Sequence, residues 1–248
     1  MFIAESDPPR AKPDRLRRLA IALDEEGKGL SAADFLRLAV GQIGSPITLG
    51  TAFGAEGCAL VHLVASADLP IDVFTLDTGL FFPETYELWR DLEARYGISI
   101  RAVRPAQTVA EQADTYGQAL WERQPSRCCH YRKVVPLRGL LGGYDGWITG
   151  VRRGQSAVRR EAKLASFDEQ HQLIKLNPLV GWSNEKLDAF VKTHEIPINP
   201  LHAKGYPSIG CWPCTSPVKA GEDARSGRWR GHSKTECGIH DYSENSPT

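Results

Sequence analysis

The sequence contains no run of 18 apolar residues, no internal repeat and no low-complexity tract. Its 30 basic and 30 acidic side chains give a formal net charge of zero, so no global field favours nucleic acid or an anionic membrane. Residues 1–18 mix acidic residues, prolines and arginines and lack the apolar centre of a secretory signal. We therefore expect a cytoplasmic globular protein with neither nucleic acid nor membrane as a partner.

Cysteine is used sparingly, with six residues in 248. In a reducing cytosol, a C-x-x-C pattern is more often a metal-binding or catalytic feature than a disulfide. One cysteine, Cys58, lies in an apolar stretch and reads as core packing. The other five form three groups: an adjacent pair (Cys128 and Cys129), a C-x-x-C (Cys211 and Cys214) and a single residue (Cys237).

The two cysteine pairs offer four soft ligands, enough for one zinc ion or one iron–sulfur cluster. Adjacent cysteines project in different directions, which strains a single-ion site, whereas a cubane presents separated iron corners. The arrangement of Cys128 and Cys129 therefore favours a [4Fe–4S] cluster, with zinc as the alternative. On a helix, Lys133 would lie one turn beyond Cys129, where its charge could offset that of the thiolates.

Strand and helix patterns alternate through the middle of the chain, which predicts an α/β fold with a mostly parallel sheet covered by helices. From residue 199 this pattern gives way to Pro, Gly, Cys and Trp, in a tail too long for a loop without function. We expect an N-terminal helical segment (1–44), an α/β domain (45–205) and a mobile C-terminal segment (206–248). The expected strands are 47–49, 71–76, 98–103, 146–149 and 171–176; the expected helices are 14–26, 31–41, 56–66, 83–96 and 184–194, besides one carrying the first cysteine pair.

Three predicted strands end in small or polar residues, and ligands of open α/β sheets bind at such strand ends. The loop 48–56 leads into a helix whose first amides could bind phosphate or sulfate, but it lacks the end of a Walker A motif and also suits a plain βα turn. Asp77 follows the next strand and could alternatively cap a turn. After a later strand, Arg152 and Arg160 could bind an anion or form a solvated basic face.

The tail is basic around its single cysteine. Arg225, Arg228, Lys234 and His240 would favour the thiolate form of Cys237, which predicts a nucleophile. The alternative is an unreactive surface cysteine.

Several of these stretches occur together in one known family. They are Thr51 to Glu56, Leu76 to Gly79, Cys128-Cys129, Arg152-Arg153, Gly205 to Thr215 and Lys234 to His240. With them the chain resembles the phosphoadenylyl/adenylyl-sulfate reductase family, and more closely its iron–sulfur branch, which reduces adenosine 5′-phosphosulfate (APS). The two cysteine pairs distinguish that branch from the cluster-free one, which uses the 3′-phosphorylated substrate (PAPS). The chain departs from its relatives at Ala52, where they usually have a second hydroxyl residue.

The resemblance implies a Rossmann-like, adenine nucleotide alpha hydrolase-like domain with helices on both faces of the sheet. It implies thioredoxin-dependent reduction of APS to sulfite and AMP through an S-sulfocysteine, in assimilatory sulfate reduction toward cysteine. The implied cofactor is a [4Fe–4S] cluster on Cys128, Cys129, Cys211 and Cys214; the catalytic residues are Cys237, Lys133 and His240. The implied substrate-binding residues are Thr51, Phe53, Gly54, Asp77, Arg152, Arg160, Arg225 and Arg228.

Two other functions stay open on the sequence. A PAPS reductase or dual-specificity enzyme would share these motifs. A zinc-stabilised nucleotide-binding or RNA-modifying module would need no sulfonucleotide chemistry, although an ATP-using relative would carry a Ser-Gly-Gly-x-Asp-Ser loop that this chain lacks. The oligomeric state, a homo-oligomer included, is also open.

Overall fold

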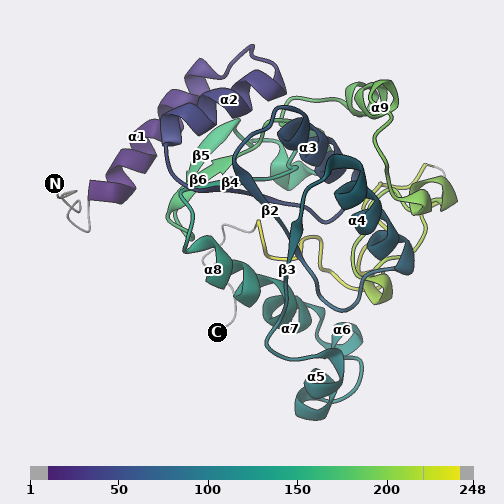
Figure 1. The fold of residues 1–248 in the computed structure, drawn as a ribbon. Helices are drawn as coiled ribbons and strands as arrows, with labels where there is room; N and C mark the ends of the chain where they lie inside the picture. The colour runs from purple at the N-terminus through teal and green to yellow at the C-terminus, as the bar shows by residue number, and fades with distance from the viewer. Residues whose placement is uncertain (1–10, 220, 241–248) are drawn as a thin grey trace.

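The computed structural model describes residues 11–219 and 221–240. Parts of the predicted N-terminal segment (1–44) and C-terminal segment (206–248) therefore lie outside the described residues. Within the described ranges, six strands form one sheet in the order β3-β2-β1-β4-β6-β5 (Figure 1). All neighbouring strands are parallel except β5, which runs antiparallel to β6. The predicted α/β class is confirmed.

The strands lie close to their predicted positions, with one addition. The unpredicted strand is β5, which forms a hairpin with β6 at the edge of the sheet. The sequence analysis began the last strand at residue 171, but residues 169–172 form the turn of this hairpin. The bounds are β1 (Ile47–Gly50), β2 (Ile71–Leu76), β3 (Ile100–Val103), β4 (Gly146–Ile148), β5 (Ala165–Asp168) and β6 (Leu173–Leu176).

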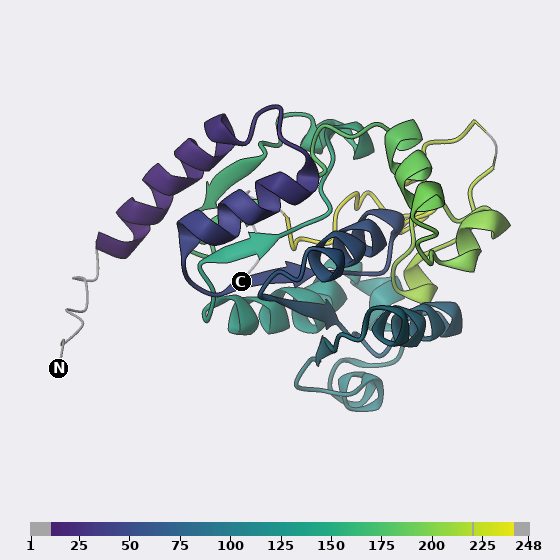
Figure 2. The ribbon, with the colours of Figure 1, turned by 45° about the horizontal axis from the view of Figure 1, so that its top comes forward.

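The helices of the described residues are packed on both faces of the sheet (Figure 2). The predicted N-caps are confirmed: the hydroxyl of Ser31 accepts from the Asp34 amide at 3.1 Å, and that of Ser183 from the Lys186 amide at 3.2 Å. The α-helices are α1 (Ala11–Glu26), α2 (Ala32–Ile43), α3 (Ala55–Ser66), α4 (Pro83–Tyr96), α5 (Val109–Tyr116), α6 (Leu120–Arg123), α7 (Pro125–Cys129), α8 (Val135–Leu141) and α9 (Asn184–Thr193). In the described ranges, none is long and apolar enough to cross a membrane.

Successive residues of a strand point to opposite faces of a sheet, and two core clusters follow from this alternation. Val73 belongs to the cluster under α1, α2, α3, α4 and α9, whereas Phe74 belongs to a second cluster on the other face. In the same way, Ile148 belongs to the first cluster and Trp147 to the second. The sheet therefore buries both faces, as parallel sheets do.

The second face is covered by α8 and by the C-terminal tail. Ile239 packs against the cluster that contains Trp147, and the ring of His240 stacks on the Trp147 ring at 5.3 Å. Figure 1 shows the yellow end of the chain on the side of the sheet where α8 lies. The tail is thus part of the packing of this face.

The loop after β1 is anchored by an aromatic ring. Phe53 is fully buried, stacks on Trp89 at 5.6 Å and meets Phe81 edge-on at 6.3 Å. Its φ of 59° is in the left-handed region, which costs a non-glycine residue free energy. Packing of the ring therefore offsets the backbone strain and fixes the start of α3.

Phe53→Ala is expected to lower the free energy of unfolding by about 3–5 kcal/mol, because it removes a fully buried ring. Urea unfolding followed by circular dichroism measures this. The control is Ile21→Ala, since Ile21 is 67% exposed and should change stability by less than about 1 kcal/mol. Equal losses in the two variants would contradict the anchoring role.

Candidate functional site

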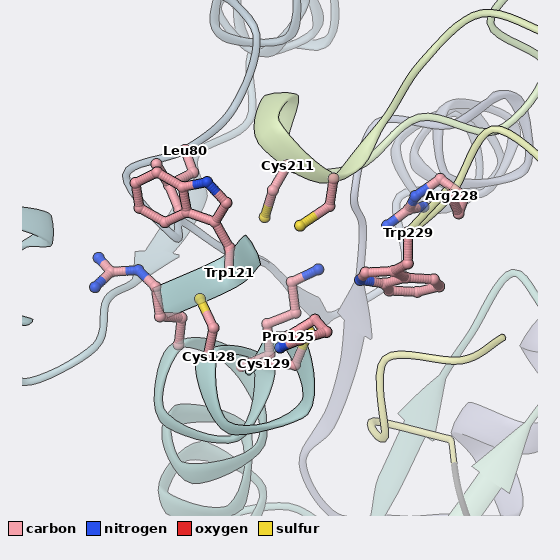
Figure 3. Close-up of a pocket in the computed structure, with 11 residues that line it drawn as sticks. Leu80, Trp121, Pro125, Cys128, Cys129, Cys211, Arg228 and Trp229 are labelled. Carbon is pink, nitrogen blue, oxygen red and sulfur yellow. The ribbon is translucent and has the colours of Figure 1, made fainter. Parts of the chain in front are cut away.

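Both cysteine pairs line one cavity (Figure 3). Cys128 and Cys129 enter from α7, while Cys214 ends the short helix η5 (Trp212–Cys214) and Cys211 is its N-cap. Figure 3 shows the sulfur atoms of Cys128 and Cys211 directed toward a common space. The cavity lining also includes Leu80, Trp121, Pro125, Arg132, Lys133, Arg228 and Trp229.

A π-helical turn follows the first cysteine pair. The expected continuous α-helix is interrupted at η1 (His130–Val134) before α8 begins. The wider turn changes the angular phase of the side chains, and such turns often occur at functional sites. Lys133 nevertheless lines the cavity with the cysteines, and so does its neighbour Arg132.

The sequence analysis missed Arg132, which is 3% exposed. Its Nε donates to the Thr78 carbonyl at 2.7 Å, and its Nη1 donates to Gln112 Oε1 at 3.1 Å. Gln112 Nε2 lies 3.8 Å from Cys128 Sγ, and Thr78 Oγ1 lies 3.2 Å from Cys211 Sγ. Arg132 therefore ties the end of β2 to both cysteine segments. A buried arginine among clustered cysteines has no local sequence signature.

Burial keeps several of these thiols neutral. It raises the pKa of Cys128 to about 11 and that of Cys214 to about 12. For Lys133, burial lowers the pKa, but the thiolate forms of Cys211, Cys237 and Cys129 raise it by more, so the net pKa is raised. Lys133 is therefore a cation once these cysteines are ionised.

The cavity suits a group that binds soft thiolates. Its four thiols come from two segments, and a metal centre would convert them to thiolates against the effect of burial. Within the described residues, no group of three or more His, Cys, Asp or Glu side chains is placed to hold a single metal ion. Cys58, in contrast, is fully buried in the first core cluster, in agreement with a packing role.

Thr51 and Asp77, two of the residues expected to bind substrate, have internal partners at the strand ends. The buried Thr51 hydroxyl accepts from the Phe53 amide at 3.1 Å. Asp77 caps a turn by accepting from the Gly79 amide at 3.1 Å, which is the alternative considered for it. It also accepts from the Tyr86 hydroxyl at 2.8 Å and from Arg104 Nε at 3.0 Å.

The side chain of Arg152 also bonds to groups inside the protein. Its guanidinium pairs with Glu56 at 2.7 Å, and it donates to the Trp182 carbonyl at 3.1 Å and to Asn184 Oδ1 at 2.9 Å. With a side chain only 7% exposed, Arg152 joins the start of α3 to the loop before α9. It is a structural link in this structure.

The two adjacent arginines after β4 have different surroundings. Arg160 is exposed, whereas Arg159 is 13% exposed in its side chain and reaches Glu236 of the tail. In the tail, Arg225 also reaches Glu236, at 3.0 Å. Arg228 lines the cysteine cavity, with its guanidinium 4.5 Å from the centre of the Trp229 ring. Gly210 admits this arginine, since a Cβ there would lie 2.2 Å from Arg228 Nη2.

The tail brings Cys237 near the first cysteine pair. Cys237 is half-buried and interacts electrostatically with Cys129 and Lys133. Lys234 Nζ donates to Ser126 Oγ of α7 at 3.2 Å. His240 was expected to add positive charge, but burial, with Lys175 and Arg159 nearby, lowers its pKa well below the ordinary value. This shift favours the neutral imidazole, so His240 adds little positive charge beside Cys237.

Comparison with known proteins identifies the family. Residues 46–217 match the phosphoadenosine phosphosulfate reductase domain, and the chain belongs to this family. The chain is 41% identical to adenosine 5′-phosphosulfate reductase 1 of Bacillus subtilis, over 92% of this chain and 98% of that protein. It is 43% identical to adenosine 5′-phosphosulfate reductase of Rhodococcus erythropolis, over 94% of this chain and 98% of that protein. The family resemblance is confirmed.

A solved structure agrees with this assignment. The crystal structure of phosphoadenylyl-sulfate (PAPS) reductase from Candida auris, in complex with phosphate, is similar with a TM-score of 0.71 and 28% sequence identity. The match covers 82% of this chain and 97% of that one.

Arg152→Ala is expected to destabilise the fold by about 3 kcal/mol or more, because Glu56 would be left as a largely buried, unpaired charge. Chemical unfolding of the full chain measures this. The control is the exposed Arg153, which donates to the Ala162 carbonyl and whose replacement by Ala should have little effect. A stable Arg152→Ala variant with weakened AMP binding would contradict this structural role and support the predicted role in substrate binding.

Proposed function

We propose that this protein reduces APS to sulfite and AMP, using a dithiol such as thioredoxin as the electron donor, in cytoplasmic sulfate assimilation. One observation carries the proposal: four cysteine thiols line one cavity, and a fifth, Cys237 of the tail, is close enough to Cys129 and Lys133 of that lining to interact with them electrostatically. A cysteine separate from a metal-binding quartet is available as a nucleophile. Relatives named APS reductases, 41–43% identical over most of the chain, support the same substrate.

In the first step, the Cys237 thiolate attacks the sulfur atom of the sulfuryl group. The bond between this sulfur and the phosphate oxygen breaks, and AMP leaves with the electron pair. Cys237 then carries an S-sulfo group. Water must be excluded at this stage, because it could take the activated sulfuryl group in place of the thiolate.

In the second step, one thiolate of the dithiol donor attacks Cys237 Sγ, and sulfite leaves with the electron pair. The second donor thiol then displaces the Cys237 thiolate and closes the donor's disulfide. The donor is oxidised by two electrons and the substrate sulfur is reduced by two. A protein donor requires Cys237 to be accessible, and its half-buried position is compatible with this.

Lys133, which lies beside the four cavity cysteines, has a role in this scheme. Cys128, Cys129, Cys211 and Cys214 would hold a [4Fe–4S] cluster, which when bound would supply a fixed negative charge near the substrate. Lys133 would offset that charge and, with Arg228, would orient the anionic part of APS toward Cys237. His240, neutral and stacked on Trp147, would hold the end of the tail on the sheet.

PAPS is the second candidate substrate, because the similar Candida auris structure is that of a PAPS reductase. The two candidates are separated by turnover of APS against PAPS with iron-reconstituted protein. Preference for PAPS would overturn the proposal that APS is the substrate.

Serine substitution of any one of the four cavity cysteines is expected to abolish or strongly destabilise the iron–sulfur centre, because each thiolate would ligate one iron atom. Iron and sulfide content and visible absorption are the measurements. Cys58→Ala is the matched control, since this cysteine lies apart in the core and its loss should leave iron content unchanged. A colourless wild-type protein with one bound zinc would point to the zinc alternative.

Cys237→Ser is expected to lower turnover by at least about 1000-fold, because the nucleophile is lost, while APS binding stays near that of the wild type. Wild-type protein mixed with radiosulfur-labelled APS and no donor should carry the label on the Cys237 peptide. Reduced thioredoxin should then release this label as sulfite. Label on another peptide, or steady turnover by Cys237→Ser, would refute the mechanism.

A further inference from the structure

The residue before Cys237 makes the most extensive ion pairing of the described tail. Glu236 receives Arg159 through two bonds: Nη2 to Oε2 at 2.9 Å and Nε to Oε1 at 3.1 Å. Arg225 Nη2 donates to the same Oε2 at 3.0 Å. A two-pronged arginine–carboxylate contact fixes the rotation of the carboxylate as well as its distance. The position of the next residue along the chain, Cys237, is thereby constrained.

This contact is shielded from solvent. The side chains of Glu236 and Arg159 are each 13% exposed, and that of Arg225 is 19% exposed. Charge pairs in such surroundings are costly to break on one side only. Another tail carboxylate, Glu222, pairs with Arg230 at 3.2 Å, but those side chains are 36% and 49% exposed, and such pairs contribute little.

The pairing joins two separate parts of the molecule. Arg159 belongs to the short helix η3 (Ala157–Arg159) beyond β4, whereas Glu236 and Arg225 belong to the C-terminal segment. Arg159 is itself held by Gln155 Oε1, and Gln155 donates to Glu56 Oε1 at 2.9 Å. Arg159 is therefore fixed to the sheet domain by Gln155, and its guanidinium is the group to which Glu236 of the tail binds.

Arg225 organises the tail around the same carboxylate. Besides its bond to Glu236, it donates to the carbonyl of Thr235 at 2.9 Å. The backbone preceding Cys237 is thus held on one side, while Ile239 packs against the sheet on the other. Cys237 lies between two anchored points.

We infer that Glu236 is a positioning residue, which docks the segment carrying Cys237 on Arg159 and so determines where the thiol meets its substrate. The docking of the tail on Arg159 is independent of the proposed function. Only the expected effect of docking on turnover rests on the proposed function. Since an ion pair can open and close without covalent change, the same contact would let the segment leave when a donor protein must reach Cys237.

Hydrogen exchange of the full-length, iron-loaded protein without substrate tests the docking. Glu236→Gln keeps the shape of the side chain and removes its charge, and exchange in residues 231–240 should accelerate by about tenfold or more. Strands β1 and β4 should exchange as in the wild type. Glu222→Gln is the matched control and should leave the tail unchanged. Unchanged exchange in Glu236→Gln would overturn the inference.

A double-mutant cycle identifies the partner. If Glu236 acts through Arg159, Arg159→Gln should accelerate exchange of the same residues, and adding Glu236→Gln should have much less than an additive effect. Fully additive effects would overturn the pairing. Glu236→Asp, which keeps the charge on a shorter side chain, should lie between wild type and Glu236→Gln.

Measurements of turnover then distinguish a docking role of Glu236 from an inhibitory role in which Glu236 occupies a substrate position. Docking predicts that Glu236→Gln lowers the rate of S-sulfocysteine formation by at least about tenfold while AMP affinity changes by less than about twofold. Tighter AMP binding with faster formation would mean that Glu236 occupies a substrate position, which overturns the inference. If the wild-type protein shows the expected exchange pattern but is inactive toward APS, the proposed function is refuted and the docking inference stands.

Discussion

The structure depends on a sheet that must bury both faces while only one is fully covered by helices. The first face lies under α1, α2, α3, α4 and α9; the second has α8 and, beside it, the C-terminal tail. The tail carries Ile239 and His240 onto this face, next to Trp147. The segment bearing the proposed nucleophile therefore completes part of the packing, and moving it away would expose apolar surface at a free-energy cost. This favours the closed position at rest.

A polar network crosses the site and links the tail to the first strand-end loop. It runs from Glu236 through Arg159 and Gln155 to Glu56 in the first turn of α3, and Glu56 pairs with the buried Arg152. The links have no fixed sequence spacing and join residues up to 99 positions apart. Because each charged or amide group is held by the next, the start of α3 and the position of Cys237 depend on one another. A ligand at either end would act on both.

Much of this could be predicted from the sequence, and the failures have physical causes. The alternation of strands and helices gave the fold class, and cysteine spacing predicted which thiols share a cavity. Strand β5 was missed because its four residues pair only through a hairpin. The turn η1 depends on backbone hydrogen bonding that residue spacing does not record. The pairing of Arg159 with Glu236 could not be predicted, because the direction of a side chain in a loop is set by its tertiary partner.

The departure of this chain from its relatives at Ala52 can be understood from the same loop. Ala52 is exposed, whereas the Thr51 hydroxyl is buried and already accepts from the Phe53 amide. Gly57 packs so closely on Thr51 that a Cβ there would lie 2.5 Å from Oγ1. The hydroxyl that remains is thus used to build the turn. Gly54, the N-cap of α3, has no side chain, so backbone amides of the first helical turn are the groups that an anion would meet. Recognition through amides does not need a hydroxyl at position 52, which explains how the loop could keep its role without one.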